Sequence, residues 1–342
     1  MAKRDRKRQH SVNLNRTVPL LAIIFICAAV FLFFLVQLIQ GGAPAIEEEA
    51  GGDTQVIINP QDMTVGKTRP AILYFRYADS SYLAKEVRDI TTRPNERMEE
   101  AVLRELMAGP QDSSANLMGL FPDGAKVEKI EAQGQMLYVT FNKELLLRER
   151  ADVNLQESNR RLMLMTQSIV NTILDLGNYS SVQILIDEKG DGIGEALPAK
   201  LFGMDIQTPL GEEPLSALNY NQDVVLLPEA VLETIIAAIN DKNWTVLYRF
   251  TLAEDPDGGT RPSFSAAREK WQALHCGIDR REVRNTTNGP NESYVILRTY
   301  MQGEMQGSAF EHEAFPVVLY PQQSIWVISY DNLLKMMGER ME

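Results

Sequence analysis

The histidines and cysteines of this sequence form few groupings that could do chemistry. The histidines are His10, His275 and His312, and neither His-Glu-x-x-His nor Cys-x-x-Cys occurs, so the usual zinc-binding spacings are missing. His275 and Cys276 are adjacent, but neighbouring side chains on a helix point apart. We therefore interpret them as a helix-terminal histidine and a buried thiol rather than as a nucleophile and its base. This pattern predicts no catalytic residue, no metal ligand and no cofactor.

A second grouping, Asp187-Glu188-Lys189-Gly190-Asp191-Gly192, is similar to the start of a calcium-binding loop. Such a loop places oxygen ligands at alternate positions and a carboxylate at the twelfth. Lys189 stands at the third position and Pro198 at the twelfth, so we interpret the run as a turn at the end of a strand. Gly-x-Ser-x-Gly, the phosphate loop and the dinucleotide fingerprint are also missing, and we predict that the protein is not an enzyme.

Three charged residues are candidates for binding. Glu86 and Arg88 are two positions apart, so on a strand they project from the same face. They could form a polar docking edge, or they could be a surface ion pair worth at most about 1 kcal/mol. Arg76, in the preceding predicted strand, is the third candidate.

Trp271 and Trp326 are the aromatic candidates for binding. Together with Tyr294 and Tyr300 they could line a ligand pocket. The alternative is that these aromatic side chains fill a hydrophobic core, as such side chains usually do. The sequence leaves both interpretations open.

The N-terminus combines a basic tip with an apolar run. Residues 1–16 carry a net charge of +5, whereas the whole chain carries −12, so residues 17–342 carry −17. Residues 17–40 contain no charged residue and are long enough to cross a bilayer, which takes about 20 apolar residues. The positive-inside rule keeps residues 1–16 in the cytoplasm and places the acidic body outside it. An acidic body also argues against nucleic acid as a partner.

Two other interpretations fit this apolar run less well. A cleaved signal peptide has an apolar region of about 7–15 residues, shorter than this one. A lipoprotein would acylate Cys27, but Ile26 precedes it and the apolar run continues beyond it. We therefore predict a single-pass cell-membrane protein whose residues 17–40 anchor it.

The body divides into two predicted α+β domains. Residues 41–70 have the composition of a flexible linker. In residues 71–210 we expect a strand at 72–77 and either a second strand or a loop over 82–90. A helix that Asn95 caps and Gly109-Pro110 ends follows, then a hairpin over 125–141, a long helix over 162–176 and a strand at 181–187. This order predicts a small sandwich with helices on one face of a sheet.

A second linker is predicted at 211–224, before a domain over 225–342. Pro228 suits the first turn of a helix, and apolar spacing indicates two further short helices before residue 275. Strands follow at about 281–285, 293–302, 308–319 and 324–330. Helices followed by a meander of antiparallel strands predict a second α+β domain, with helices against a curved sheet.

The first domain resembles the GerMN family, named for a sporulation and germination protein. The match rests on Ile72-Leu73-Tyr74-Phe75 with Leu83-Ala84-Lys85-Glu86-Val87-Arg88, on Glu105-Leu106-Met107-Ala108-Gly109-Pro110, and on Leu120-Phe121-Pro122-Asp123-Gly124. Closing pieces at 167–173 and 182–187 also fit, so that residues 71–205 are covered. The family often has proline where Lys85 stands. The resemblance implies an exported cell-envelope module without established catalysis, similar in fold to ring-building motifs, and hence self-assembly into a homo-oligomer or partner docking.

The second domain resembles the nuclear-transport-factor-two superfamily, through its element order and the Trp326 strand. That cone hosts both enzymes and binding domains. Taken together, we expect an extracytoplasmic binding or assembly protein of the bacterial envelope, linked to sporulation or germination and acting through envelope proteins or peptidoglycan. The alternatives are a receptor that holds a small apolar ligand in the cone, and a cell-wall hydrolase.

Overall fold

The computed structural model describes residues 66–112, 115–147, 154–256 and 258–339. The predicted basic tip (1–16), the predicted transmembrane helix (17–40) and most of the predicted linker (41–70) lie outside these residues. Within the described ranges, no helix has both the length and the apolar character that crossing a membrane requires. The α+β class predicted for the body is confirmed.

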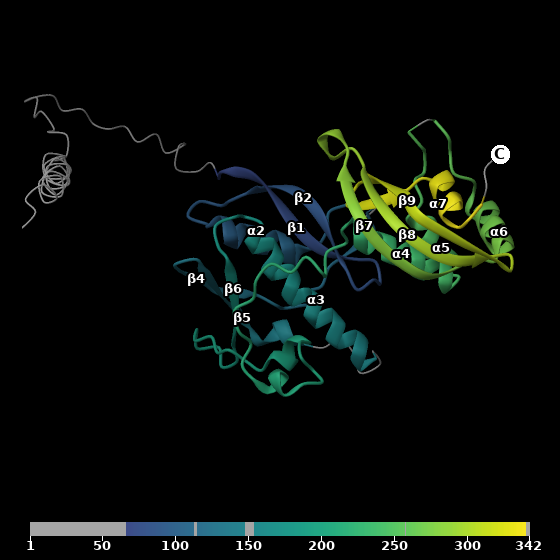
Figure 1. The fold of residues 1–342 in the computed structure, drawn as a ribbon. Coiled ribbons are helices and arrows are strands. Elements are labelled where there is room, and N and C mark those ends of the chain that lie inside the picture. Colours follow the sequence, from purple (N-terminus) through teal and green to yellow (C-terminus); the bar gives the residue numbers. More distant parts are fainter. Residues whose placement is uncertain (1–65, 113–114, 148–153, 257, 340–342) are drawn as a thin grey trace, which may run out of the picture. The chain divides into compact units, whose positions relative to one another are not determined.

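Two three-stranded sheets, rather than the single small sheet expected, make up the first part of the body (Figure 1). One has the order β2-β1-β3 and is antiparallel, with β1 at Thr68–Tyr77, β2 at Leu83–Thr91 and β3 at Leu117–Met118. The other has the order β4-β5-β6, with β4 at Val127–Gln133, β5 at Met136–Asn142 and β6 at Ser181–Asp187. Strands β5 and β6 run parallel, because α3 connects them.

Helix α3 explains why the two sheets stay separate. The hydroxyl of Thr172 accepts a hydrogen bond from the Tyr74 backbone N–H (3.1 Å), and the hydroxyl of Ser168 donates one to the Tyr74 carbonyl (2.6 Å). These two side chains therefore occupy the edge of β1 opposite β2. A strand of the second sheet cannot pair there, and this pairing by hydroxyls is not visible in the hydrophobic pattern of the sequence.

The two helices of this part differ from the expected bounds at their N-termini. Helix α2 spans Met98–Ala108, and Arg97 is its N-cap instead of Asn95, which has a positive φ of 63°. It ends at Gly109, as expected, with a φ of 92° that favours glycine. Helix α3 spans Leu155–Leu174, seven residues longer at its start than predicted, because the side chain of Asn154 caps it through the Gln156 N–H (2.9 Å).

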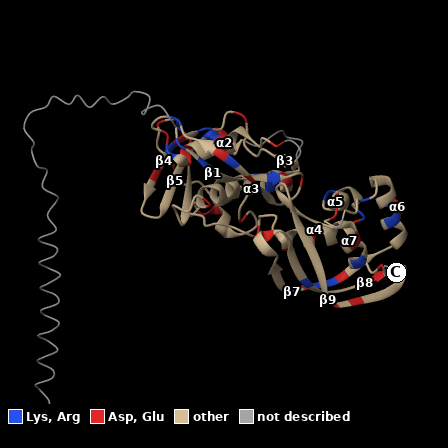
Figure 2. Ribbon diagram, turned by 90° about the horizontal axis from the view of Figure 1, so that it is seen from above, with Lys and Arg blue, Asp and Glu red and all other residues tan. Residues whose placement is uncertain are grey.

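The C-terminal part has the predicted order of helices followed by an antiparallel meander. Its helices are α4 (Pro228–Asn240), α5 (Trp244–Arg249) and α6 (Phe264–Leu274), and α7 (Tyr330–Met336) follows the last strand. The sheet order is β10-β9-β8-β7, with β7 at Gly277–Asn288, β8 at Val295–Met305, β9 at Ser308–Gln322 and β10 at Ile325–Ile328. Basic and acidic residues are interspersed along these strands (Figure 2).

Short 3₁₀ helices complete the described chain: η2 (Lys143–Leu146), η3 (Ala199–Phe202), η4 (Pro209–Glu212) and η5 (Pro290–Glu292). Residues 211–224, predicted to be a linker, are anchored to the first part. Leu218 exchanges two backbone hydrogen bonds with Val182 (2.9 and 2.8 Å), and the side-chain amide of Asn171 bonds both backbone groups of Asn221. The domain boundaries at these residues stay predictions.

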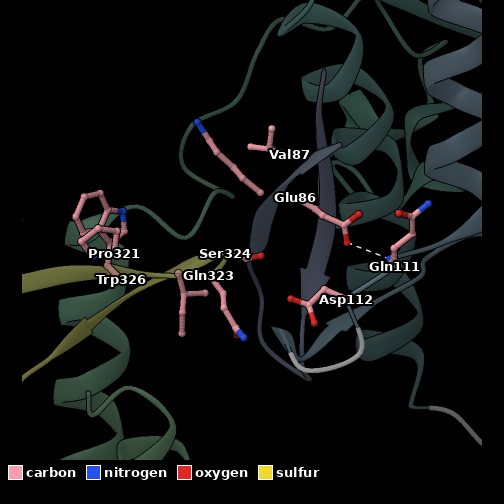
Figure 3. A pocket seen from close by; sticks show the side chains of 10 residues that line it. Glu86, Val87, Gln111, Asp112, Pro321, Gln323, Ser324 and Trp326 are labelled. Carbon is pink, nitrogen blue, oxygen red and sulfur yellow. Dashed lines mark hydrogen bonds between the residues drawn. The ribbon is translucent and has the colours of Figure 1, made fainter. Parts of the chain in front are cut away.

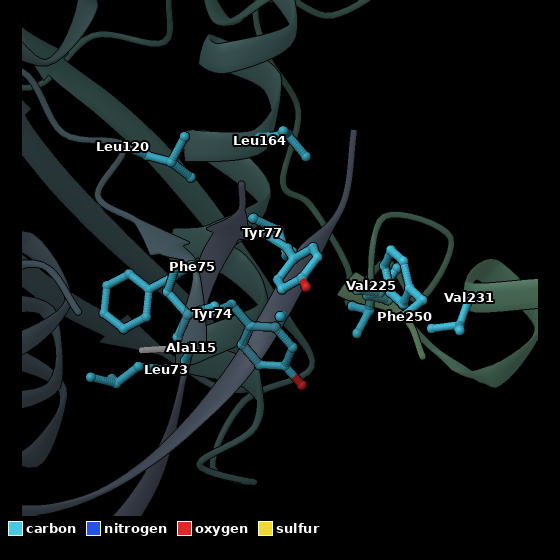
Figure 4. Packing of buried hydrophobic residues seen from close by; sticks show 14 of the residues in the cluster. Leu73, Tyr74, Phe75, Tyr77, Ala115, Leu120, Leu164, Val225, Val231 and Phe250 are labelled. Atoms are coloured by element: carbon cyan, nitrogen blue, oxygen red, sulfur yellow. The ribbon is translucent and has the colours of Figure 1, made fainter. Parts of the chain in front are cut away.

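Buried apolar side chains run without a break from the first part of the body into the second. Tyr77 at the end of β1 packs on Phe250 with ring centroids 5.5 Å apart, beside Val225 and Val231 (Figure 4). The two parts of the body therefore share a continuous hydrophobic core. Residues from both parts can line one groove.

Candidate functional site: a groove beside strand β2

Glu86 and Arg88 lie on the same face of β2, and that face is buried. Only 9% of Glu86 and 7% of Arg88 is exposed, because α2 covers them. The Arg88 Nε donates to Glu86 Oε1 at 2.9 Å, and Nη2 also contacts this oxygen. The pair is therefore an internal ion pair, not a surface one.

This ion pair holds the end of α2 against β2. The Arg88 guanidinium donates to the carbonyls of Glu105 (3.2 Å) and Gly109 (3.0 Å), which have no partner within the helix because they lie at its C-terminus. Glu86 Oε2 accepts a hydrogen bond from the Gln111 N–H (3.1 Å). Glu86 and Arg88 thus position the turn after α2, instead of presenting charge to solvent.

Strand β2 is an edge strand of its sheet, and its outer side is only partly paired. The Leu83 N–H bonds the Val224 carbonyl (2.7 Å), and the Leu226 N–H bonds the Leu83 carbonyl (2.8 Å). The N–H and C=O groups of successive residues point to alternate sides of a strand. Those of Lys85, Val87 and Asp89 therefore point outward, like those of Leu83. Within the described residues, the N–H groups of these three have no acceptor.

A groove of about 560 Å³ lies beside this open edge (Figure 3). One wall comes from β2 and the turn after α2, and the other comes from the β9–β10 turn with Trp326. A second hollow of about 410 Å³ shares Lys85, Ser324 and Trp326 with it and continues along residues 225–229. Val87, at the mouth of the groove, is 71% exposed.

Arg76 lies away from the groove. It is buried, pairs with Glu157 through Nη1 (2.5 Å), and donates to the carbonyls of Asp79 (3.0 Å) and Ser80 (2.9 Å). It therefore braces the turn between β1 and β2 against the start of α3, and its burial keeps the guanidinium away from a ligand on the surface.

Trp271 and Trp326 have different surroundings. Trp271 is fully buried, with ring centroids 6.2, 6.3 and 6.0 Å from those of Trp244, Tyr248 and Tyr330. In this structure it is a core side chain and offers no surface to a ligand. Trp326 is partly exposed and lines the groove. Of the five predicted binding residues, Glu86 and Trp326 line opposite walls of the same groove, and Arg88 is bonded to Glu86.

Lys85 and Val87 are groove residues that sequence reasoning missed. The available signal was the alternation in β2, where charged Glu86 and Arg88 share one face and Val87 lies on the other. A strand with apolar Val87 facing out and an ion pair facing in inverts the usual pattern, and this inversion leaves an apolar side chain on the open face of the sheet.

The other candidate groups are held in structural roles. The Asp187 carboxylate accepts N–H bonds from Lys189 to Gly192 (2.7–3.2 Å). Desolvation works against its ionisation, but these bonds outweigh it and keep the pKa of Asp187 below its usual range. Burial raises the pKa of the Cys276 thiol to about 12, so it is protonated at neutral pH. No cluster of three or more metal-binding side chains occurs among the residues described.

One family model matches the first part of the body. Residues 72–191 match the model of the Germane family, described as sporulation and spore germination. The match covers about a third of the chain. The resemblance drawn from the sequence is confirmed over this range. No curated protein matches the chain.

Three solved structures are similar to parts of the chain. They are the tandem GerMN domains of the sporulation protein GerM from Bacillus subtilis (18% identity, TM-score 0.29), a putative lipoprotein from Clostridium perfringens (17%, 0.23) and a nuclear-transport-factor-two-like protein of unknown function from Cytophaga hutchinsonii (12%, 0.22). The matches cover 45%, 35% and 30% of this chain, and 46%, 76% and 86% of those chains. The chain thus spans about half the length of the GerM structure.

Proposed function

We propose that this protein is a membrane-anchored binding or assembly protein that acts outside the cytoplasm in sporulation or spore germination. The observation that carries the proposal is the match of residues 72–191 to the Germane family. The basic tip and the apolar run of residues 17–40 support an anchor with its N-terminus in the cytoplasm. Contacts with envelope proteins or peptidoglycan, including self-assembly, are the proposed mode of action.

The features of the described part favour binding over catalysis. The buried charges each meet a partner: Glu86 meets Arg88, and Arg76 meets Glu157. The thiol of Cys276 is buried and protonated at neutral pH. By contrast, the groove beside β2 offers unbonded backbone groups and apolar walls, which suit the capture of a partner.

The topology is tested with reporter fusions. Alkaline phosphatase and green fluorescent protein are each fused after residue 65 and after residue 342. We expect phosphatase activity and no fluorescence at both positions, together with digestion of residues 66–342 by protease added to spheroplasts. Fluorescent fusions that resist protease would refute an extracytoplasmic body.

The physiological role is tested by gene deletion. We expect loss of sporulation efficiency or of germination rate, restored by the full chain and not by a chain that lacks residues 1–40. Normal spore formation and germination in the deletion strain would refute the role while leaving the topology result unaffected.

A further inference from the structure

We infer that the groove beside β2 binds one extended peptide segment of a partner protein, which adds to β2 as a strand, faces Lys85 with an acidic residue and packs an apolar residue against Trp326. This inference rests on the proposed function and names the chemistry of the partner.

The backbone of the protein already begins this strand. Residues 224–226 run parallel to β2 and pair with Leu83, and then Pro228 starts α4 and the chain turns away. The next outward-facing groups of β2 belong to Lys85, Val87 and Asp89, where the edge is left unpaired among the described residues. A guest strand there would continue the pairing that residues 224–226 begin, by bonding the next backbone groups along β2.

The pairing of β1 with β2 also indicates that the backbone groups of Asp89 point away from β1. Pro70 pairs with Asp89 and has no N–H to donate. Proline is tolerated at this place because Asp89 directs its own backbone groups away from β1, toward the open edge. Donors and acceptors on the outer side of β2 are therefore available to a guest without loss of any β1–β2 bond.

The opposite wall argues for a single strand and against a second folded copy. An added strand lies about 4.8 Å from β2. If that strand were the β2 of a second copy, its own β1 would lie about 4.8 Å further out. Pro321, Ser324 and Trp326 stand on that side of the groove. A single extended segment instead gains contact with both walls.

The charges of the lining favour an acidic segment. Glu86 is bonded to Arg88, and Asp112 is engaged in an interaction within the molecule. Lys85 has no carboxylate partner in the described part of the chain, and its Nζ lies 5.7 Å from the centroid of the Tyr74 ring. Among the charged residues that line this groove, Lys85 is thus the one left to face a guest, whereas Asp89, further along β2, is not part of the lining.

The apolar part of the groove sets the second requirement. Val87 is exposed at the mouth, and Ile325 and Trp326 form the opposite wall. Side chains of a strand alternate between two faces, so an apolar residue at every second position can meet these surfaces. The expected guest is therefore a β-prone stretch with a Glu or Asp between apolar residues.

The test measures fluorescence anisotropy of labelled heptapeptides with the full-length chain in detergent micelles. The probe TVEVTVT is compared with TVKVTVT. It is also compared with two N-methylated forms of TVEVTVT, which carry the methyl groups on one or the other set of alternate residues. We expect binding of the first, about threefold weaker binding of the lysine peptide because one solvated ion pair is lost, and at least tenfold weaker binding of the N-methylated register that faces β2.

Protein variants then locate the site. V87P removes the outward N–H at a position where an edge strand tolerates proline, and we expect at least tenfold weaker binding of TVEVTVT. V87A keeps that donor and is the matched control, with a smaller loss. K85E should reverse the preference, so that TVKVTVT binds more tightly than TVEVTVT. Near-UV circular dichroism checks that each variant is folded.

Three results would overturn the inference: no binding of TVEVTVT to the wild-type chain, equal binding of both N-methylated registers, or an unchanged peptide preference in K85E. A chain dimer in sedimentation velocity that V87P abolishes would instead assign the edge to a second copy. If V87P does not fold, the N-methylated peptides decide the question on the wild-type chain. None of these results changes the reporter-fusion outcome, so failure here is distinguishable from failure of the proposed function.

Discussion

The buried ion pair between Glu86 and Arg88 makes a sharp prediction for stability. R88M keeps an apolar stem and removes the guanidinium, which donates to Glu86 and to the carbonyls of Glu105 and Gly109. Glu86 would remain buried with the Gln111 N–H as its donor. Removing one member of a buried pair costs about 3–5 kcal/mol, so we expect a loss of this size in the free energy of unfolding.

Arg104 provides the matched control on the neighbouring helix face. It also pairs with two glutamates, Glu96 and Glu105, but its side chain is 31% exposed against 6% for Arg88. Water screens such a pair, so R104M should cost at most about 1 kcal/mol. The double variant E86L/R88M should lose less than R88M alone, because no unpaired buried charge remains.

Urea unfolding of the full chain in micelles, followed by far-UV circular dichroism, measures all four proteins. The result that contradicts this reasoning is a loss of less than about 1 kcal/mol for R88M, equal to that of R104M. The pair would then be solvated, and the turn after α2 would not depend on it.

Three further predictions concern the C-terminal part. W271A should destabilise the protein by about 3–5 kcal/mol in the same assay, whereas W326A should have a much smaller effect. Burial raises the pKa of Cys276, so the unfolded thiol ionises before the folded one, and stability should fall as pH rises from about 9 toward 12. C276A should reduce this slope but not abolish it, because burial also raises the pKa of Tyr77 to about 12. Desolvation lowers the pKa of His312 against an opposing hydrogen bond from the ring to the Lys335 backbone carbonyl, so the unfolded state binds the proton more tightly. Stability should therefore fall as pH drops below about 6.5, less so in H312Q.

Much of the fold could be predicted from periodicity and turn chemistry. The stripe of Leu162, Met165, Ile169 and Ile173 on α3 is buried as expected, and Gly109 ends α2. Both signals are local, since they depend on residues within one or two turns. The division into two sheets was not predicted, because it depends on Ser168 and Thr172 reaching a backbone about 95 positions away in sequence.

The groove could be predicted only in part. The spacing of Glu86 and Arg88 predicts that they share one face of a strand. Their burial depends on the packing of α2 over β2, and the spacing of residues within β2 does not predict this packing. Trp326 was found as an aromatic residue, but its neighbours across the groove come from the other end of the body. Such long-range proximity is set by tertiary packing, and a pattern within one segment does not contain it.

The sealing of β1 by Ser168 and Thr172 has a consequence for solubility. With that edge occupied at Tyr74, and Leu83 covered by residues 224–226, residues 85–89 of β2 are a stretch of the β2-β1-β3 sheet where an aggregation hazard remains. Lys85 and Asp89 flank Val87 there, and charges at such places act as gatekeepers against amyloid-like stacking. Replacing Asp89 with an apolar residue would therefore strengthen strand addition at this edge and, by the same change, lower the concentration at which the protein stays monodisperse.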